Sequence, residues 1–237
     1  MVTREQKMVH WLPRKLLGAT RQASEDASLF DAKVLKCGAE CCIFSYFDAS
    51  GNKLAVRWCI WDQTRDHEKM VIEYMKTHIA PRYHSHFVFP MMNRGLRVHV
   101  PKCTVTRSKC TGNVTLIGST MPLYKCDLYV YLTSACHPVA GVVKKALRRI
   151  SFAMQLMHRI GLVHQDIRAQ NVLLDERHVA SLGDCGCTVG LNAPIACGLP
   201  GVTHPEGQDI ALEENDIFAL AVLTEACNIS LAREPTA

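Results

Sequence analysis

The sequence predicts an α+β fold, with a β-rich first half and a helical second half. Three stretches indicate it. Apolar and aromatic residues dominate Ala32–Ile60, an apolar stripe with helical spacing runs through Val139–Ile160, and a tight turn joins two short apolar runs within 172–182. The chain has 237 residues, of which 48% are hydrophobic, so it is long enough for one large domain or two modest lobes around a real core.

Charge and cysteine usage argue against several classes of protein. The 27 basic and 22 acidic residues give a net charge of +5, which is no signature of nucleic-acid binding. No apolar run approaches the ~18 residues that a membrane span needs, and the first residues contain no apolar signal core. The 12 cysteines form no C-x-x-C pair, so we expect reduced, mostly buried thiols in an intracellular protein.

The first part of the chain is predicted to be a tail followed by strands. Residues 1–31 are charged and aperiodic, and fit a flanking helix or plain disorder equally well. Strands are predicted over Cys41–Phe47 and Lys53–Trp58, because a cluster of turn residues separates two apolar-rich runs. Strand alternation then places Arg57 on the face opposite Val56.

A helix is predicted over Asp66–Ile79. Glu68 falls on the apolar stripe of this helix, which also contains Ile72, Met75 and Ile79. A carboxylate on such a stripe needs a partner if it is buried, and Arg57 is the candidate, so we expect an ion pair. Alternatively, Glu68 is an exposed acid favoured by the positive end of the helix dipole.

The middle of the chain contains one more strand and two helices. A strand is predicted over Asn113–Thr120, followed by the connector Met121–Lys125 and a short helix that begins at Asp127. The helix Val139–Ile160 has the clearest periodicity, and Gly161 ends it where a C-terminal glycine is expected.

The stretch from Val163 to Gly186 contains the residues with the most obvious chemistry. Asp166 and Asn171 lie in a polar loop before the first of the two short apolar runs, and Asp184 follows the second. Two strands joined by a tight turn bring their outer ends together, so the three side chains are expected on one rim. Two carboxylates and an amide oxygen suit Mg²⁺, and a carboxylate free of metal can take a proton from a hydroxyl. The alternative is an Asp-rich turn in an unrelated α/β domain.

This spacing resembles the catalytic core of a protein kinase, in which H-R-D-L-x-x-x-N is followed by D-F-G. His164–Asn171 and Asp184–Gly186 stand in those places. The resemblance implies ATP and Mg²⁺ as cofactors, with Asp166 accepting the hydroxyl proton. It also implies metal binding by Asn171 and Asp184, and contact of Arg168 with the γ-phosphate where the family has lysine.

The resemblance extends to nucleotide-binding positions in the first half. The family's glycine-rich loop is reduced here to a single glycine, Gly38, and its V-A-I-K lysine falls on Arg57. Glu68 matches the glutamate that pairs with that lysine. The connector matches the hinge whose backbone receives adenine, which implies that Met121 and Leu123 bind ATP.

A two-lobed kinase-like arrangement follows from the same resemblance. It comprises a tail over residues 1–31, a small β-rich N-lobe over 32–120 and an incomplete helical C-lobe over 121–237. Cys197–Glu206 aligns with C-G-T-P-x-x-x-A-P-E, and the helix beginning at Glu214 carries Asp216 as its anchoring acid. No long helical pattern is recognised after Leu223, so we expect a fragment, a truncated version or a decayed copy.

Short segments are most similar to the serine/threonine kinase of the unique short region of alphaherpesviruses. These segments are Gly38–Phe44, Asp66–Glu68, Asp127–Leu132 and Leu182–Asp184. The subfamily implies protein substrates of host and virus, phosphorylated at basic-flanked Ser/Thr sites, and a location in the host cytoplasm and nucleus.

Two functions are compatible with these residues. The first is an ATP- and Mg²⁺-dependent serine/threonine protein kinase. The second is a pseudokinase that acts as a binding module, which the single glycine, Arg57, Cys185 and Leu199 support. The complete set of Asp166, Asn171 and Asp184 favours the kinase, because a decayed site has no physical reason to retain all three.

Overall fold

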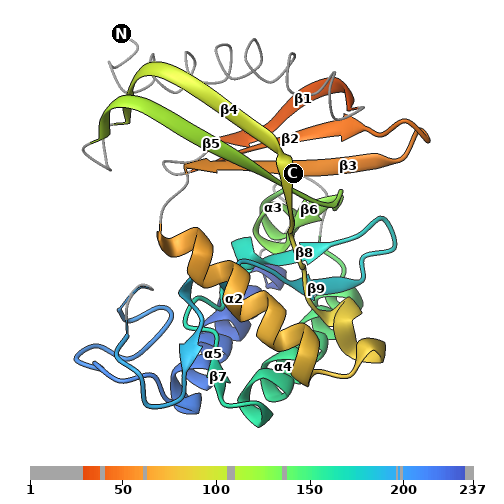
Figure 1. The fold of residues 1–237 in the computed structure, drawn as a ribbon. Coiled ribbons are helices and arrows are strands. Elements are labelled where there is room, and N and C mark those ends of the chain that lie inside the picture. The colour runs from red at the N-terminus through yellow and green to blue at the C-terminus, as the bar shows by residue number, and fades with distance from the viewer. Residues whose placement is uncertain are drawn as a thin grey trace, which may run out of the picture. The chain divides into compact units, whose positions relative to one another are not determined.

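A computed structural model of the chain describes residues 29–37, 41–60, 63–105, 110–134, 138–195, 197 and 200–232. The chain separates into two compact units (Figure 1). The first unit comprises the chain up to Asp62 and Pro90–Leu123, and the second comprises Gln63–Phe89 and the chain from Tyr124 onward. The predicted α+β class is confirmed, since the first unit is a β-sheet and the second is mainly helical.

The first unit is a five-stranded sheet in the order β1-β2-β3-β5-β4, with all neighbours antiparallel. Its strands are β1 (Phe30–Cys37), β2 (Cys41–Phe47), β3 (Lys53–Ile60), β4 (Met91–Val105) and β5 (Cys110–Pro122). The strands predicted around Phe44, Val56 and Leu116 are confirmed. The sequence patterns missed β4, because Gly95 and Pro101 interrupt its alternation.

The β2–β3 turn forms where the sequence predicts it, because one carboxylate organises the turn. Asp48 Oδ1 accepts hydrogen bonds from the backbone N–H of Ser50 and of Asn52, at 2.9 and 2.8 Å. The side-chain amide of Asn52 donates to Oδ2 at 3.0 Å. These bonds favour the ionised carboxyl, and the side-chain bond from Asn52 is the main cause of the lowered pKa of Asp48.

Gly118 provides a stability prediction for this sheet. A Cβ atom at position 118 would lie 2.9 Å from Leu96 Cβ and 3.1 Å from Val56 Cγ1. Gly118→Ala is therefore expected to lower the free energy of unfolding by about 1–3 kcal/mol through overpacking. Gly141→Ala is the control, because a Cβ there meets nothing within 4 Å. Urea denaturation would contradict the prediction if the two variants unfolded at the same midpoint.

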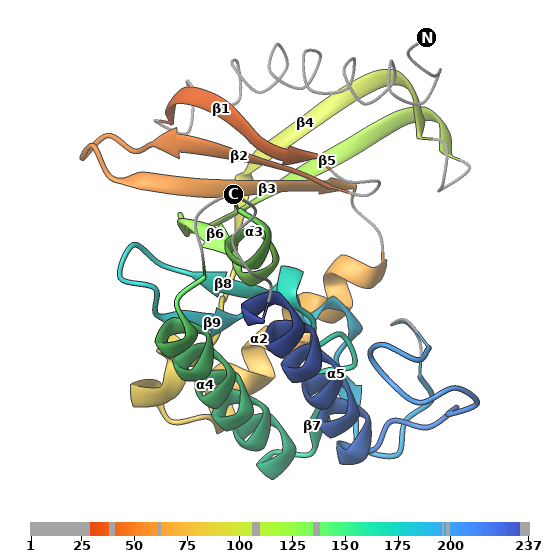
Figure 2. The same cartoon turned by 180° about the vertical axis from the view of Figure 1, so that it is seen from behind.

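The second unit contains four α-helices in its described part. They are α2 (Gln63–His78), α3 (Leu128–Thr133), α4 (Ala140–Arg159) and α5 (Glu213–Leu231). Figure 2 shows α4 and α5 side by side. Asp127 caps α3, because its Oδ1 accepts from the backbone N–H of Val130 at 2.8 Å.

Short strands and 3₁₀ turns complete this unit. Strands β6 (Cys126–Asp127), β8 (Val172–Leu174) and β9 (Ala180–Leu182) form one small sheet, and β7 (Leu162–Val163) pairs with β10 (Val189–Gly190). The 3₁₀ turns are η1 (Pro81–His86), η2 (Ala169–Asn171) and η3 (Cys185–Cys187).

The core of the second unit lies between its helices and its small sheet. The predicted stripe of α4 is buried at Val143, Ile150, Met154 and Met157, and Leu147 is partly buried. Helix α5, whose start the resemblance predicts at Glu214, continues to Leu231. Apolar residues lie all round α5, so its sequence has no amphipathic period and only the resemblance predicted the helix.

Helix α2 packs within the second unit, although the sequence assigns it to the first lobe. Its apolar residues Val71 and Met75 belong to the same buried cluster as Ile150 of α4. The lobe boundaries inferred from the resemblance remain a prediction. Among the residues described, no helix has the length and apolar character needed to cross a membrane.

Candidate active site

The β8–β9 hairpin brings the chain around Asp184 next to Asn171. The strands pair antiparallel with Val172 opposite Leu182, and the turn between them is held by Asp175 Oδ1, which accepts from the backbone N–H of Val179 at 2.7 Å. At the open end, the backbone N–H of Gly183 donates to the carbonyl of Asn171 at 2.8 Å. Asp184 therefore follows a residue that is hydrogen-bonded to Asn171.

Asn171 holds the carboxylate of Asp166. Its Nδ2 donates to Asp166 Oδ2 at 2.7 Å and to the Asp166 carbonyl at 2.8 Å. Arg168 Nε lies 3.2 Å from the same Oδ2, with the Arg168 side chain 36% exposed. Of the residues that the structure describes, none donates a hydrogen bond to Asp166 Oδ1. Asp166 is 6% exposed, and its Oδ1 keeps the acceptor capacity that a base needs.

Asp184 is exposed and has a left-handed backbone conformation, with φ 61° and ψ 70°. Such a conformation is uncommon for residues other than glycine, and it concentrates at functional sites. The next residue, Cys185, is buried with its Sγ 3.9 Å from Met75 Sδ of α2. A Cβ at Gly186 would lie 3.4 Å from Asp184 Oδ1. The backbone thus turns between a buried thiol and an exposed carboxylate.

A fully buried carboxylate, Asp216 at the start of α5, anchors the loop that contains Asp166. It accepts from the backbone N–H groups of His164 and Gln165 at 2.8 and 2.9 Å. His158 Nε2 of α4 lies 2.9 Å from Asp216 Oδ2. The anchoring role that the resemblance implies for Asp216 agrees with this geometry. The sequence reasoning missed His158, because nothing in the local pattern links it to a residue 58 positions away.

His164 connects this anchor to Asp184 and Asp166. Its Nε2 lies 3.2 Å from the carbonyl of Gly183, and the backbone N–H of Asp166 donates to its Nδ1 at 3.3 Å. A carbonyl only accepts, so Nε2 carries the proton and Nδ1 is the acceptor. The ring therefore links the two ends of the candidate site.

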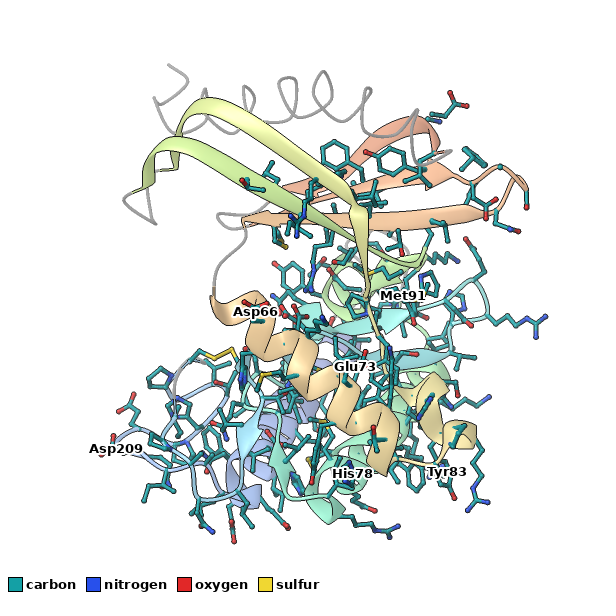
Figure 3. The ribbon with its side chains drawn as sticks, viewed as in Figure 1. Asp66, Glu73, His78, Tyr83, Met91 and Asp209 are labelled. Carbon is teal, nitrogen blue, oxygen red and sulfur yellow. A yellow bond between two sulfur atoms is a disulfide. The ribbon has the colours of Figure 1, made fainter. Side chains whose placement is uncertain are left out.

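Helix α2 reaches the segment after Asp184 through His67. Its Nε2 donates to the backbone carbonyl of Thr188 at 2.6 Å. Figure 3 labels Asp66, the preceding residue, at the first turn of this helix. The sequence reasoning did not assign a role to His67.

Gln165 is a buried polar residue of the catalytic loop. Its φ is 68°, it is fully buried, and neither polar atom of its amide has a hydrogen-bond partner among the described residues. A buried amide without partners costs free energy, whereas an apolar side chain of similar shape does not.

Gln165→Met is therefore expected to raise the free energy of unfolding by about 1 kcal/mol. Gln155→Met is the control, since Gln155 is exposed on α4. Urea denaturation measures both variants. A lower free energy of unfolding in Gln165→Met would contradict the prediction that the amide has no hydrogen-bond partner.

The arginine and glutamate predicted to pair lie in different units. Arg57 is on β3, where its neighbours across the sheet are Ile43 and Ser119. Glu68 is on α2, between the exposed Asp66 and the buried Val71. Their ion pair remains a prediction.

The positions predicted to contact adenine belong to the end of the first unit. Met121 is part of β5 and lies opposite Ala55 of β3, and Leu123 follows directly after that strand ends. The predicted connector is thus partly strand. Gly38 and Leu199 lie outside the described residues.

The expectation that the cysteines are reduced is wrong for one pair. Cys187 and Cys197 form a disulfide, with their Cα atoms 5.6 Å apart (Figure 3). Spacing rules search for short cysteine motifs, whereas here a loop of the second unit brings the two residues together. Cys185 and Cys227 are buried, and burial raises the pKa of the Cys227 thiol to about 11.

The donor groups at this site suit magnesium. Mg²⁺ in nucleotide sites is held by one or two carboxylates together with phosphate oxygens and water. Asp184 offers an exposed carboxylate and Asn171 an amide oxygen. In the described part of the chain, this site included, no three His, Cys, Asp or Glu side chains gather in a way that could hold a metal ion, so the ligands proposed here are one carboxylate and one amide oxygen.

Comparison with known proteins identifies the family. The profile of the family described as protein tyrosine and serine/threonine kinase matches residues 50–193, more than half of the chain. The chain belongs to this kinase family. Members of the family use ATP and Mg²⁺. The matched kinase segment includes Arg57, Glu68, Asp166, Asn171 and Asp184.

Individual relatives of this kinase include a parasite protein and viral proteins. The Probable serine/threonine-protein kinase 2 of Plasmodium falciparum (isolate K1 / Thailand) is 32% identical over 41% of this chain and 21% of its own length. The Serine/threonine-protein kinase of Suid herpesvirus 1 (strain Kaplan) is 32% identical over 38% of this chain and 28% of its own.

The Serine/threonine-protein kinase US3 of human herpesvirus 1 (strain 17) is 28% identical over 38% of this chain and 20% of its own. The predicted resemblance to alphaherpesvirus kinases is thereby confirmed. The matched segment spans less than a third of the length of each of these three relatives.

Proposed function

We propose that this chain is a serine/threonine protein kinase that transfers the γ-phosphate of ATP to hydroxyl groups of proteins. The observation that supports it best is the hydrogen bond of 2.7 Å from Asn171 to Asp166 Oδ2, which leaves Oδ1 open. Asp184 is placed next to this pair by the bond between Gly183 and Asn171. A base and two oxygen ligands are thus available together, as phosphoryl transfer requires.

Each of these residues has a separate role in the proposal. Asp166 accepts the proton of the substrate hydroxyl at Oδ1, and Asn171 fixes the orientation of that carboxylate. Asn171 and Asp184 also hold Mg²⁺, which supplies positive charge that offsets the negative charge developing on the transferred phosphoryl group. Arg168, beside the base, provides a second positive charge toward the γ-phosphate.

The first unit is proposed to bind the rest of the nucleotide. Arg57, paired with Glu68, steadies the phosphates, and the backbone at Met121 and Leu123 receives adenine, while Gly38 lies over the phosphates. We further propose host and viral proteins as substrates, and the host cytoplasm and nucleus as the location. The subfamily resemblance supports these last two points.

A thermal-shift titration tests the proposal most directly. ATP is expected to raise the melting temperature more in the presence of Mg²⁺ than in EDTA, and the Mg²⁺-dependent part is expected to vanish in Asp184→Asn. A radiolabelled-ATP assay with a basic protein substrate then measures transfer. Absence of any Mg²⁺-dependent ATP effect, together with no transfer, would overturn the proposal and leave a binding module without catalysis.

A further inference from the structure

The Cys187–Cys197 disulfide closes a short loop that begins beside the metal-binding carboxylate. Cys187 is the last residue of η3, three positions after Asp184, and the sequence separation of the two cysteines is 10. Both cysteines are partly exposed, whereas Cys185 and Cys227 are buried. Small reagents from solution can therefore reach this sulfur pair, and access is one of the factors that control thiol–disulfide exchange.

The loop is firmly attached to the candidate site at its Cys187 end. The backbone N–H of Thr188 donates to the carbonyl of Cys185 at 3.2 Å, and the Thr188 carbonyl accepts from His67 at 2.6 Å. Val189 then pairs with Val163, which directly precedes the anchored His164. Movement at Cys187 is thus coupled to α2 and to the loop that contains Asp166.

The Cys197 end is attached through its neighbours. The backbone N–H of Asn192 donates to the carbonyl of Ala211, and that of Ala211 to the carbonyl of Ala193, both at 2.8 Å. On one side, the backbone N–H of Ile195 donates to the carbonyl of Asp209 at 3.0 Å, and on the other, Gly201 donates to His204 at 2.8 Å. Among the described residues, no backbone hydrogen bond involves Cys197 itself. The disulfide adds a direct covalent link between this part of the loop and Cys187.

We propose that Cys187 and Cys197 form a reversible redox modification site, whose disulfide keeps the loop closed and supports the geometry of Asp184 and Thr188. Two molecules of a small thiol reduce it. They lose two electrons and two protons and become one disulfide, while the Cys187–Cys197 bond is cleaved into two thiols. A small disulfide reverses the reaction. The disulfide form is the better ordered and the more active one, because cross-linking removes open conformations of the loop. The effect on activity rests on the proposed kinase function.

The first test follows the sulfur chemistry and the loop, independently of catalysis. The protein is equilibrated with glutathione buffers from oxidising to reducing, alkylated, and mapped by peptide mass spectrometry. Both cysteines are expected to become alkylated together as the buffer turns reducing. The rate of limited proteolysis between residues 188 and 200 is expected to rise several-fold over the same range of buffers in which the cysteines become alkylated. Alkylation of Cys187 without reductant, or cleavage that reduction leaves unchanged, would overturn the proposal.

Two serine variants provide matched controls. Cys197→Ser is expected to be cleaved at the rate of the reduced protein in every buffer. Cys126→Ser is expected to respond to glutathione like the unmodified chain, because Cys126 is a free, partly exposed cysteine of the same unit. Burial, with help from the neighbouring Asp127, raises the pKa of the Cys126 thiol. The assignment of the redox site to Cys187 and Cys197 would be refuted if the cleavage rate of Cys197→Ser still changed with the glutathione buffer. It would also be refuted if the cleavage rate of Cys126→Ser no longer did.

A second measurement concerns the active site. The rate of phosphoryl transfer is expected to fall several-fold on reduction and to return on oxidation, with no such change in Cys197→Ser. An equal rate in both states would overturn the link to catalysis. Absence of transfer in either state would reject the kinase function instead, while alkylation and proteolysis still decide the redox site.

Discussion

Replacing Asp184 by asparagine is expected to reduce phosphoryl transfer by at least about 10³-fold, equivalent to about 4 kcal/mol of lost transition-state stabilisation. The carboxylate is exposed, and its oxygens are the charged ligands proposed for Mg²⁺. Asparagine has nearly the same volume and tolerates the left-handed backbone at φ 61°. The substitution therefore removes a charge while keeping the side-chain volume and the backbone conformation of position 184.

The measurement is the initial rate of radiolabel transfer from ATP, accompanied by the melting temperature without nucleotide. Asp209→Asn is the matched control, because Asp209 is an exposed aspartate in the same unit and has no proposed role in metal binding (Figure 3). It should keep both the rate and the melting temperature of the unmodified chain. An Asp184→Asn variant that retained more than a tenth of the rate would show that the metal is not held by this carboxylate.

Removing the Asp216 side chain is expected to cause the largest loss of stability. Asp216→Ala leaves three donors without their acceptor: the backbone N–H groups of His164 and Gln165, and Nε2 of His158. These groups are in the interior, where water cannot readily replace the carboxylate. Breaking one buried, charged hydrogen-bond network costs about 3–5 kcal/mol of unfolding free energy.

Urea denaturation, followed by the fluorescence of the native tryptophans, measures this loss. Glu214→Ala is the control, because Glu214 is an exposed acid in the same first turn of α5 and contributes at most about 1 kcal/mol through the helix dipole. The anchoring role would be contradicted if both variants unfolded at similar urea concentrations.

The sequence predicted the elements whose residues follow a local period. Helix α4 was recognisable because Val143, Ile150, Met154 and Met157 recur at helical spacing, and all four are buried. The β8–β9 hairpin was recognisable because two apolar runs flank a polar turn. Since a hairpin fixes which ends meet, spacing alone predicted that the chain just before Asp184 lies next to Asn171, and the backbone bond between Gly183 and Asn171 confirms it.

Contacts between positions far apart in the chain were not predictable in this way. The bond from His158 to Asp216 and the disulfide from Cys187 to Cys197 depend on how α4, α5 and the loop between β10 and α5 pack. The pairing of β7 with β10 involves only two residues on each side, too few to show any alternation. Long-range packing, and not local preference, decides such features.

Asp216 binds the main chain of the catalytic loop. Its hydrogen bonds therefore do not depend on which side chain follows His164. Every amino acid except proline presents the same amide hydrogen to Asp216 Oδ1. Position 165 can therefore exchange the arginine of the kinase motif for glutamine, and lose a charge, while the base at Asp166 keeps its place. Proline is excluded twice, because it lacks the hydrogen and cannot adopt the φ of 68° found at this position. The backbone conformation of the loop can therefore stay the same while the residue at position 165, next to the base, changes.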